Sequence, residues 1–154
     1  MRISAKVDYA LRGLTELAAL EAEHGRAVTR DQMAGAQEIP IAFLENILLE
    51  LKRGGIVRSV RGQQGGFRLA RAADLITVAD VIRTLDGPLA SVRGLRPEEL
   101  EYGGAAQSLP TVWVALRFRL REVLEGVTLA DLVSGQLPPE IRDLAAPPEA
   151  WQPR

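Results

Sequence analysis

The first third of the chain has the apolar periodicity of helices. Apolar residues recur with a period of about 3.6 from residue 4 to residue 24, where Ser4 can cap a helix and Gly25 can end it. A Thr-Arg-Asp-Gln capping-box sequence opens a second, shorter helix at Thr29, which we expect to end near Gln37. Two helices separated by a short turn are therefore predicted at the start of the chain.

A third helix is predicted from Pro40 to the glycine pair Gly54-Gly55. Proline costs no hydrogen bond in the first turn of a helix, and glycine readily takes the left-handed conformation that ends one. The apolar stripe of this helix consists of Phe43, Leu44, Ile47, Leu48 and Leu51. The opposite side carries short or polar residues near its N-terminal end, which allow close approach to another surface.

Two short strands and a further helix follow. Apolar and polar residues alternate over residues 56–60 and again over 67–70. The sequence Arg-Gly-Gln-Gln-Gly-Gly at 61–66 predicts a hairpin with a flexible tip. A helix of about 77–86 then completes a predicted winged helix-turn-helix unit over residues 1–87.

This arrangement indicates a protein that reads DNA. Glu45 could accept a hydrogen bond from a cytosine amine in the major groove, and Asn46 could pair with adenine. Arg61, at a tip of little bulk, can enter the minor groove, where A·T-rich DNA concentrates negative potential. Residues 40–71 carry a net charge of +4 and residues 72–154 a net charge of −4, and such a basic patch favours DNA binding. The predicted DNA-binding residues are Thr29, Ala42, Glu45, Asn46, Lys52, Arg58, Ser59, Arg61, Gly62, Gly65, Gly66 and Arg68. Of these, Lys52, Arg58 and Arg68 are expected to contact phosphates.

The second half of the chain predicts a dimerisation element. Residues 88–109 lack a clear periodicity and are expected to form a loop. The segment 110–136 is expected to hold a long helix and a short following helix, and 137–154 a disordered tail. The long helix is apolar around more of its circumference than one small domain covers, which favours packing against the same helix of a second subunit. The predicted dimerisation residues are Trp113, Leu116, Phe118, Leu120 and Leu124.

Composition narrows the chemistry of the chain. Its 154 residues include no cysteine and a single histidine, His24, so disulfides, thiolate metal sites and a histidine-based catalytic triad are not expected. No catalytic residue and no metal site is predicted, and the chain is not expected to be an enzyme. Neither a signal peptide nor a run of about 20 apolar residues occurs in the sequence. The cytoplasm is the expected location.

Four segments resemble the Rrf-two family of bacterial winged-helix transcriptional regulators, the type of IscR, NsrR and CymR. They are MRISAKVDYALRGLTELA at 1–18, IPIAFLENILLELKRGGIVRSVRGQQGGFRLA at 39–70, ITVADVIRTLDGPLASVRG at 76–94 and VTLADL at 127–132. The resemblance implies a mostly α fold with a small β-hairpin wing, that is, a winged helix-turn-helix plus a long C-terminal dimerisation helix. It also implies base readout by Glu45 and entry of Arg61 into the minor groove.

The resemblance raises the question of a cofactor. Cluster-binding relatives carry three cysteines after the DGPL sequence, whereas residues 89–109 of this chain contain none. An iron–sulphur cluster is therefore not expected, and no cofactor is predicted. Asp8 matches a position at which some of these relatives supply a carboxylate ligand to the cluster from the partner subunit. Because this chain has no cysteines, Asp8 is better interpreted as a helix-surface charge. A small metabolite or a regulatory protein stays open as the signal.

The sequence thus predicts a homodimeric repressor that binds a pseudo-palindromic operator in double-stranded DNA. One alternative is a winged-helix protein-interaction module that does not read DNA. A second is that the long helix packs against its own domain. Trp113, Tyr102 and Phe118 could line an effector pocket, although core and interface packing is the simpler interpretation of these aromatic residues.

Overall fold

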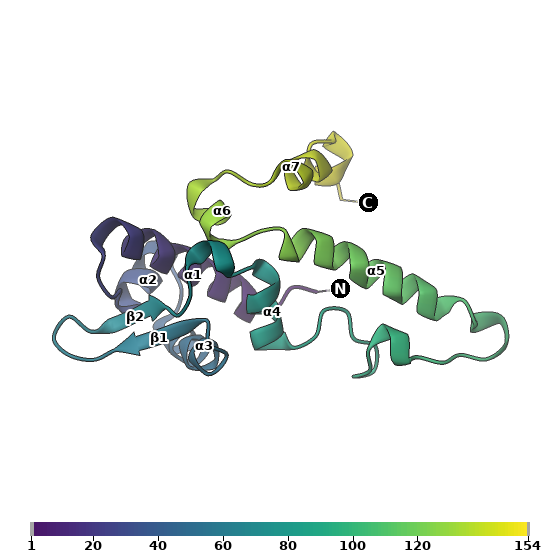
Figure 1. Cartoon of the computed structure of the whole chain (residues 1–154), viewed down its shortest axis with the longest axis horizontal. Coiled ribbons are helices and arrows are strands. Elements are labelled where there is room, and N and C mark those ends of the chain that lie inside the picture. The colour runs from purple at the N-terminus through teal and green to yellow at the C-terminus, as the bar shows by residue number, and fades with distance from the viewer. Residues whose placement is uncertain (1, 154) are drawn as a thin grey trace.

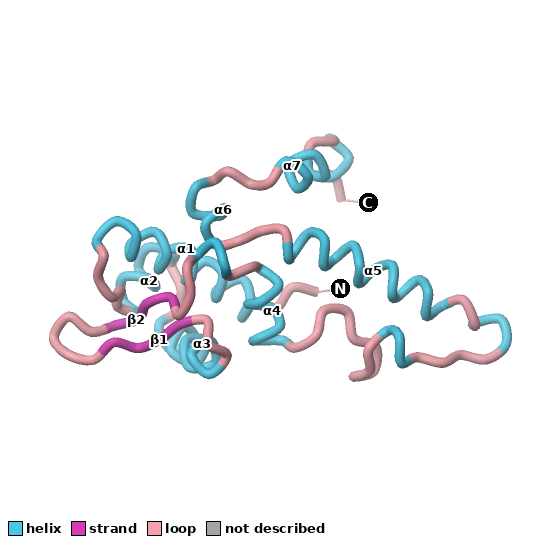
Figure 2. Tube along the Cα trace, in the orientation of Figure 1, coloured by secondary structure: helices cyan, strands magenta, loops and turns pink. Residues whose placement is uncertain are grey.

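The computed structural model describes residues 2–153, which form mainly helices and one antiparallel hairpin (Figures 1 and 2). The helices are α1 Ala5–His24, α2 Arg30–Gln37, α3 Ile41–Arg53, α4 Val78–Asp86, α5 Leu109–Glu125, α6 Leu129–Ser134 and α7 Pro139–Ala145. The strands are β1 Val57–Val60 and β2 Gly66–Leu69, and short 3-10 turns lie at Ala73–Leu75, Pro97–Glu99, Gly104–Ala106 and Pro148–Trp151. The predicted fold class, a winged helix-turn-helix with a long C-terminal helix, is confirmed.

Side-chain caps begin the first two helices, as the sequence predicts. The Ser4 hydroxyl accepts a hydrogen bond of 3.2 Å from the Val7 N–H. In the capping box of α2, Thr29 Oγ1 accepts from the Gln32 N–H at 3.2 Å, and Gln32 Oε1 accepts from the Thr29 N–H at 2.9 Å. Glu38 then takes the left-handed conformation, with φ of 52°, and turns the chain into α3. These local signals set the ends of the helix-turn-helix.

The hairpin is anchored to the turn between α1 and α2. Within it, Arg58 lies opposite Arg68 and Ser59 lies opposite Phe67. Val28, just before α2, exchanges backbone hydrogen bonds of 2.8 and 2.9 Å with Phe67 and so extends the pairing by one residue on the far side of β2. The loop between the strands points away from the domain, at the left end of Figure 1.

One apolar core joins α1–α4, the hairpin and α6. Its largest fully buried side chains include Leu14, Leu17, Met33, Leu44, Leu51, Ile56, Ile76 and Leu129. The periodicity assigned Phe43 to the buried stripe of α3, and this was wrong: Phe43 is 62% exposed. It lies at the edge of the stripe, where its ring meets that of Tyr9 with the centroids 6.3 Å apart. Periodicity identifies an apolar stripe but not how much of its width another helix covers.

The short helix α6 packs into the core of the winged helix-turn-helix unit, although the sequence analysis grouped it with the predicted dimerisation helix. Its entry segment pairs with the start of α4, through hydrogen bonds of 2.9 Å from Val78 N–H to the Val127 carbonyl and from Leu129 N–H to the Ile76 carbonyl. Leu129 is completely buried, and α6 packs against α1. The chain therefore returns to the domain after α5, and the predicted boundary at residue 87 separates segments that share one core.

The long helix α5 leaves this core. Figure 1 shows it extending away from α1–α4, with the segment 87–108 running out beside it. None of its residues is fully buried, and its main contacts are with α4 and the turn at Pro97–Glu99. Within residues 2–153, no helix has both the length and the apolar character required to cross a membrane.

The C-terminal segment differs from the disordered tail that the sequence predicts. Residues Pro139–Ala145 form α7, and Pro148–Trp151 form a 3-10 turn. The Trp151 indole N–H closes this segment by donating to the Ala145 carbonyl over 2.6 Å. Proline at the start of a helix supplies the required φ, and Pro139 and Pro148 each begin one of these helical turns.

The position of α6 leads to a test of stability. We expect Leu129→Ala to lower the free energy of unfolding by about 2–5 kcal/mol, because it opens a cavity in the core. Leu144→Ala, at a leucine of α7 that is 64% exposed, is the matched control and should change it by less than about 0.5 kcal/mol. Urea unfolding of both variants gives the comparison. Equal effects would show that α6 is not part of the core.

Candidate nucleic-acid interface

The outer side of α3 is exposed because its other side is fixed in the core. Leu44, Ile47, Leu48 and Leu51 are buried, which leaves the predicted base-reading residues in contact with solvent. Those residues are Ala42, Glu45 and Asn46, all exposed. The structure therefore places them together on the first two turns of one helix face.

Two contacts hold the polar side chains of this face. Glu45 forms an ion pair with Arg30, the first residue of α2. The Asn46 side-chain amide donates to the Ala42 carbonyl over 3.3 Å, one turn earlier in α3. Glu45 is thus positioned by the other helix of the helix-turn-helix. Arg30 was not among the site residues predicted from the sequence, because a contact between two helices has no fixed spacing along the chain.

The wing depends on two glycines at the start of β2. A Cβ on Gly65 would lie 2.6 Å from the Val60 carbonyl oxygen, so the hairpin can close only without a side chain there. Gly66 has φ of 152°, and a Cβ on it would lie 2.5 Å from the Val28 carbonyl oxygen. Gly62 also has a positive φ, of 105°. The tip is consequently narrow, and Arg61 is exposed on it.

Four cations of this region have no carboxylate partner within residues 2–153, where an ion pair is counted up to 4.0 Å. They are Lys52, Arg53, Arg58 and Arg61. All four are exposed. Their charge therefore acts on the surroundings of α3 and the hairpin rather than on a neighbouring side chain. Arg53 was not among the predicted residues, although its place beside Lys52 on the exposed side was visible in the sequence.

Arg68, for which the sequence predicts a phosphate contact, also makes contacts within the fold. Its guanidinium donates to the Gly25 carbonyl and lies 3.7 Å from Glu21 Oε1. The other oxygen of Glu21 accepts from the Leu69 N–H at 2.9 Å. Arg68 thus ties β2 to the end of α1, a contact between segments far apart in sequence.

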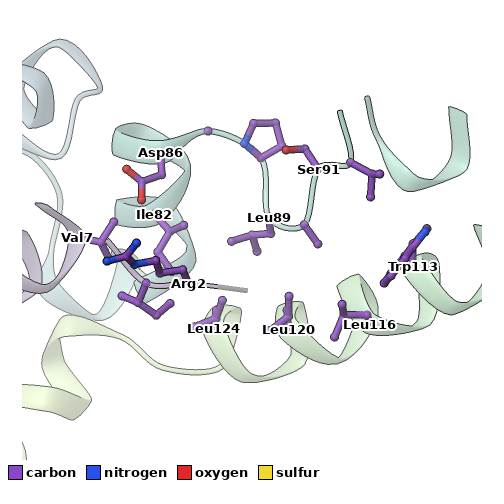
Figure 3. Close-up of a pocket in the computed structure, with 15 residues that line it drawn as sticks. Arg2, Val7, Ile82, Asp86, Leu89, Ser91, Trp113, Leu116, Leu120 and Leu124 are labelled. Atoms are coloured by element: carbon purple, nitrogen blue, oxygen red, sulfur yellow. The ribbon is translucent and has the colours of Figure 1, made fainter. Parts of the chain in front are cut away.

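The predicted dimerisation residues fall on two sides of α5. Trp113, Leu116, Leu120 and Leu124 line a cavity between α5 and the segment 87–92 (Figure 3). Phe118 is 57% exposed and does not line that cavity. Of the three aromatic residues considered for an effector pocket, only Trp113 lines it, while Tyr102 lies under the Arg93 guanidinium.

Ion pairs fix α5 to the elements beside it. Glu125 accepts from Arg83 of α4 and, over 3.0 Å, from Arg121 one turn earlier. The hydrogen bonds from Arg83 and then Arg121 hold the pKa of the Glu125 carboxyl below its usual value. Arg117 pairs with Glu98 of the neighbouring turn. The orientation of α5 is therefore set partly by charged contacts at the surface.

The chain is similar to known proteins in both sequence and fold. A family described as "Rrf2: Iron-dependent Transcriptional regulator" matches residues 3–135. The chain belongs to the Rrf2 family. The family is one of transcriptional regulators, and the chain is a DNA-binding regulator of the HTH type.

Individual relatives agree with this assignment. CymR of Bacillus subtilis, named as an HTH-type transcriptional regulator, is 35% identical over 135 residues, which cover 87% of this chain and 91% of CymR. A Mycobacterium tuberculosis H37Rv relative, Rv1287, provisionally named as an HTH-type regulator, is 48% identical over 145 residues, covering 94% and 89% of the two chains. A solved structure of CymR, described as the global cysteine regulator of B. subtilis, is similar to this chain with a TM-score of 0.73 at 32% identity. The match covers 88% of this chain and 98% of CymR. IscR of T. potens gives 0.70 at 28% identity, covering 100% and 93%.

The residues of this Rrf2 chain do not fit an iron–sulphur cluster. The sequence has no cysteine, and within residues 2–153 no three histidine, cysteine or acidic side chains gather as metal ligands would. Asp8 lies 3.4 Å from Arg12 in an ion pair along α1. His24 ends α1 and lies 3.7 Å from Glu23. An iron–sulphur cluster therefore has no part in the function proposed for this chain.

The wing geometry can be tested by adding one methyl group. Gly66→Ala should lower the free energy of unfolding by about 1–3 kcal/mol, since alanine is strained at this φ and its Cβ meets the Val28 carbonyl. Gly103→Ala is the matched control, because a Cβ there meets nothing within 4 Å and φ is −93°. Urea unfolding measures both. A Gly66→Ala protein as stable as the control would contradict this backbone path.

Proposed function

We propose that this Rrf2 regulator is a homodimeric repressor that binds a pseudo-palindromic operator. The observation that carries the proposal is the exposed face of α3 beside a narrow glycine tip, in a region where four cations have no acidic partner among residues 2–153. A helix fits the major groove, and a thin arginine-bearing tip fits the minor groove. A regulator of transcription acts where the chromosome is, so we infer a cytoplasmic location in a bacterial cell.

Base readout is assigned to the first two turns of α3. Ala42 allows close approach, while Glu45 and Asn46 supply an acceptor and an amide for base edges. Arg30 holds the Glu45 carboxylate through their ion pair. Ordering this side chain before DNA arrives lowers the entropic cost of the contact. Arg30 is thereby a positioning residue for readout.

The wing and the adjacent cations are assigned to the DNA backbone and the minor groove. Arg61 enters the minor groove, with Gly62 and Gly65 keeping the tip thin. Lys52, Arg53 and Arg58 contact phosphates. Ser59 and the N-terminus of α2 at Thr29 add neutral donors. Arg68 and Gly66 act within the fold, by anchoring β2.

Dimerisation is assigned to the exposed apolar surface of α5. The side chains of Val112 and Phe118 are 54% and 57% exposed. No element within residues 2–153 covers these two side chains of α5. Exposed apolar residues in such number mark an interaction surface. A two-fold pair would present two α3 helices to successive major grooves, about 34 Å apart.

The role of the wing predicts the effect of one substitution. Arg61→Ala should weaken binding to the operator by about 1–3 kcal/mol, because a contact in the minor groove is lost. Arg142→Ala, at an exposed arginine of α7, serves as the control and should leave affinity unchanged. Both are measured by fluorescence anisotropy at one salt concentration. If the two variants bind alike, Arg61 does not read DNA.

The role of α5 predicts a change in oligomeric state. Phe118→Asp places a charge in the proposed interface and should shift the protein from dimer to monomer, with little change in the fold because Phe118 is exposed. Leu144→Asp, at an exposed leucine of α7, is the matched control. Analytical ultracentrifugation distinguishes the two states. A dimeric Phe118→Asp protein would place the interface elsewhere.

A further inference from the structure

A cavity of about 310 Å³ lies where α5 meets the DNA-reading unit. Its walls are mainly apolar and come from α4, the segment after it, and α5 (Figure 3). The principal wall residues are Ile82, Leu89, Trp113, Leu116, Leu120 and Leu124. In Figure 3 the three leucines of α5 lie in a row facing Leu89, and the Trp113 nitrogen points away from them. Pockets of this size and character bind small organic molecules.

One end of the cavity is polar and carries charged side chains. Arg2 and Asp86 both line this end. The Asp86 carboxylate is already engaged, by the Ser4 hydroxyl at 2.7 Å and by Lys6 Nζ at 3.7 Å. Arg2 makes no ion pair with any residue from 2 to 153. Among residues 2–153, the charge at this end of the cavity that has no partner is therefore the guanidinium of Arg2.

We propose that this cavity binds a small apolar monocarboxylic acid, which regulates DNA binding. The hydrocarbon part of the acid lies among the leucines, and its carboxylate pairs with Arg2. Guanidinium and carboxylate form strong, charge-assisted hydrogen bonds, and a neutral ligand of the same shape lacks that contribution. The regulatory part of this proposal rests on the proposed function, whereas the binding part does not.

The walls of the cavity argue for a small molecule rather than a partner subunit. They are supplied by residues 2 and 3, α1, α4, the segment 87–92 and α5 of a single chain, so one protomer provides both the apolar walls and the guanidinium. The most exposed apolar residue of α5, Phe118, does not line it. The proposed interface and the cavity thus use different sides of α5, with Leu116 between them.

A polar network connects the cavity to the recognition helix. Lys6 of α1 donates to the Leu85 carbonyl at 2.7 Å, near the end of α4, and to Glu50 Oε2 of α3 at 3.1 Å. It also lies 3.7 Å from Asp86, in the cavity wall. An anion bound at Arg2 adds a negative charge beside this network. The position of α3 therefore responds to occupancy of the cavity through Lys6.

Tryptophan fluorescence tests binding directly. Trp113 lines the cavity, and Trp151, the other tryptophan, is removed by Trp151→Phe. Octanoate is the probe, and octanamide is its neutral match in shape. We expect saturable quenching or a spectral shift with octanoate, at roughly tenfold lower concentration than with octanamide, the factor that a charged hydrogen bond supplies. No saturable change with octanoate, or equal binding of the two ligands, would overturn the proposal.

Two further variants of this reporter protein locate the site. Arg2→Gln should bring the affinities for octanoate and octanamide together, whereas the control Arg142→Gln should keep them apart. Ile82→Phe fills the cavity and should abolish binding of both ligands. If Ile82→Phe does not fold, Arg2→Gln still decides the question. Charge discrimination that survives Arg2→Gln would overturn the assignment.

Regulation is tested by measuring DNA affinity with and without saturating octanoate at constant ionic strength. We expect a change of at least about fivefold, the lower range of coupling between sites, and none with sodium acetate as the control for charge without an apolar part. A fluorescence response without a change in DNA affinity would overturn the regulatory part. Failure to bind any DNA would overturn the proposed function, and the fluorescence result would stand separately.

Discussion

The surface proposed to read DNA depends on the close approach of α3 to α1. Gly13 of α1 makes that approach possible, because a Cβ there would lie only 3.2 Å from Leu44 Cδ1 of α3. The same helix α1 contacts α2, α4, α6 and β2. Fully burying one apolar side chain such as Leu14 or Leu17 contributes roughly 1.5–3 kcal/mol. One central helix therefore holds both helices of the helix-turn-helix and the base of the wing, and the outer face of α3 is the side left over.

The parts proposed for DNA binding and for dimerisation lie at different ends of the molecule. The caps of α2, the buried stripe of α3 and the anchor of Arg68 to the end of α1 fix the proposed DNA-binding parts at one end. The helix α5 extends from the other end, attached through Arg83 and Glu125 and through the cavity walls. Because the chain returns to the core at Leu129, the excursion made by residues 87–126 begins and ends at the same domain. The C-terminal end of α5 is thus tied to the unit that holds α3, through Arg83 and Glu125.

Local signals made most of the fold predictable. The caps at Ser4 and Thr29 and the glycines after α3 set helix ends within about one residue, because capping depends on neighbours in sequence. Long-range contacts were not predictable. Periodicity could not show that Phe43 stays exposed, that Arg30 pairs with Glu45, or that Arg68 is held by Gly25 and Glu21. The return of α6 to the core was missed for the same reason: its partner α1 lies a hundred residues away.

The most direct test of the central claim is selection of genomic DNA fragments by the purified protein at near-physiological salt, followed by sequencing of the retained DNA. If α3 and the wing read DNA as a two-fold pair, one inverted repeat should be enriched, with half-site centres about one helical turn, or 34 Å, apart. Retention of fragments without a shared sequence would contradict specific readout. Enrichment of a single, unrepeated half-site would contradict the dimer.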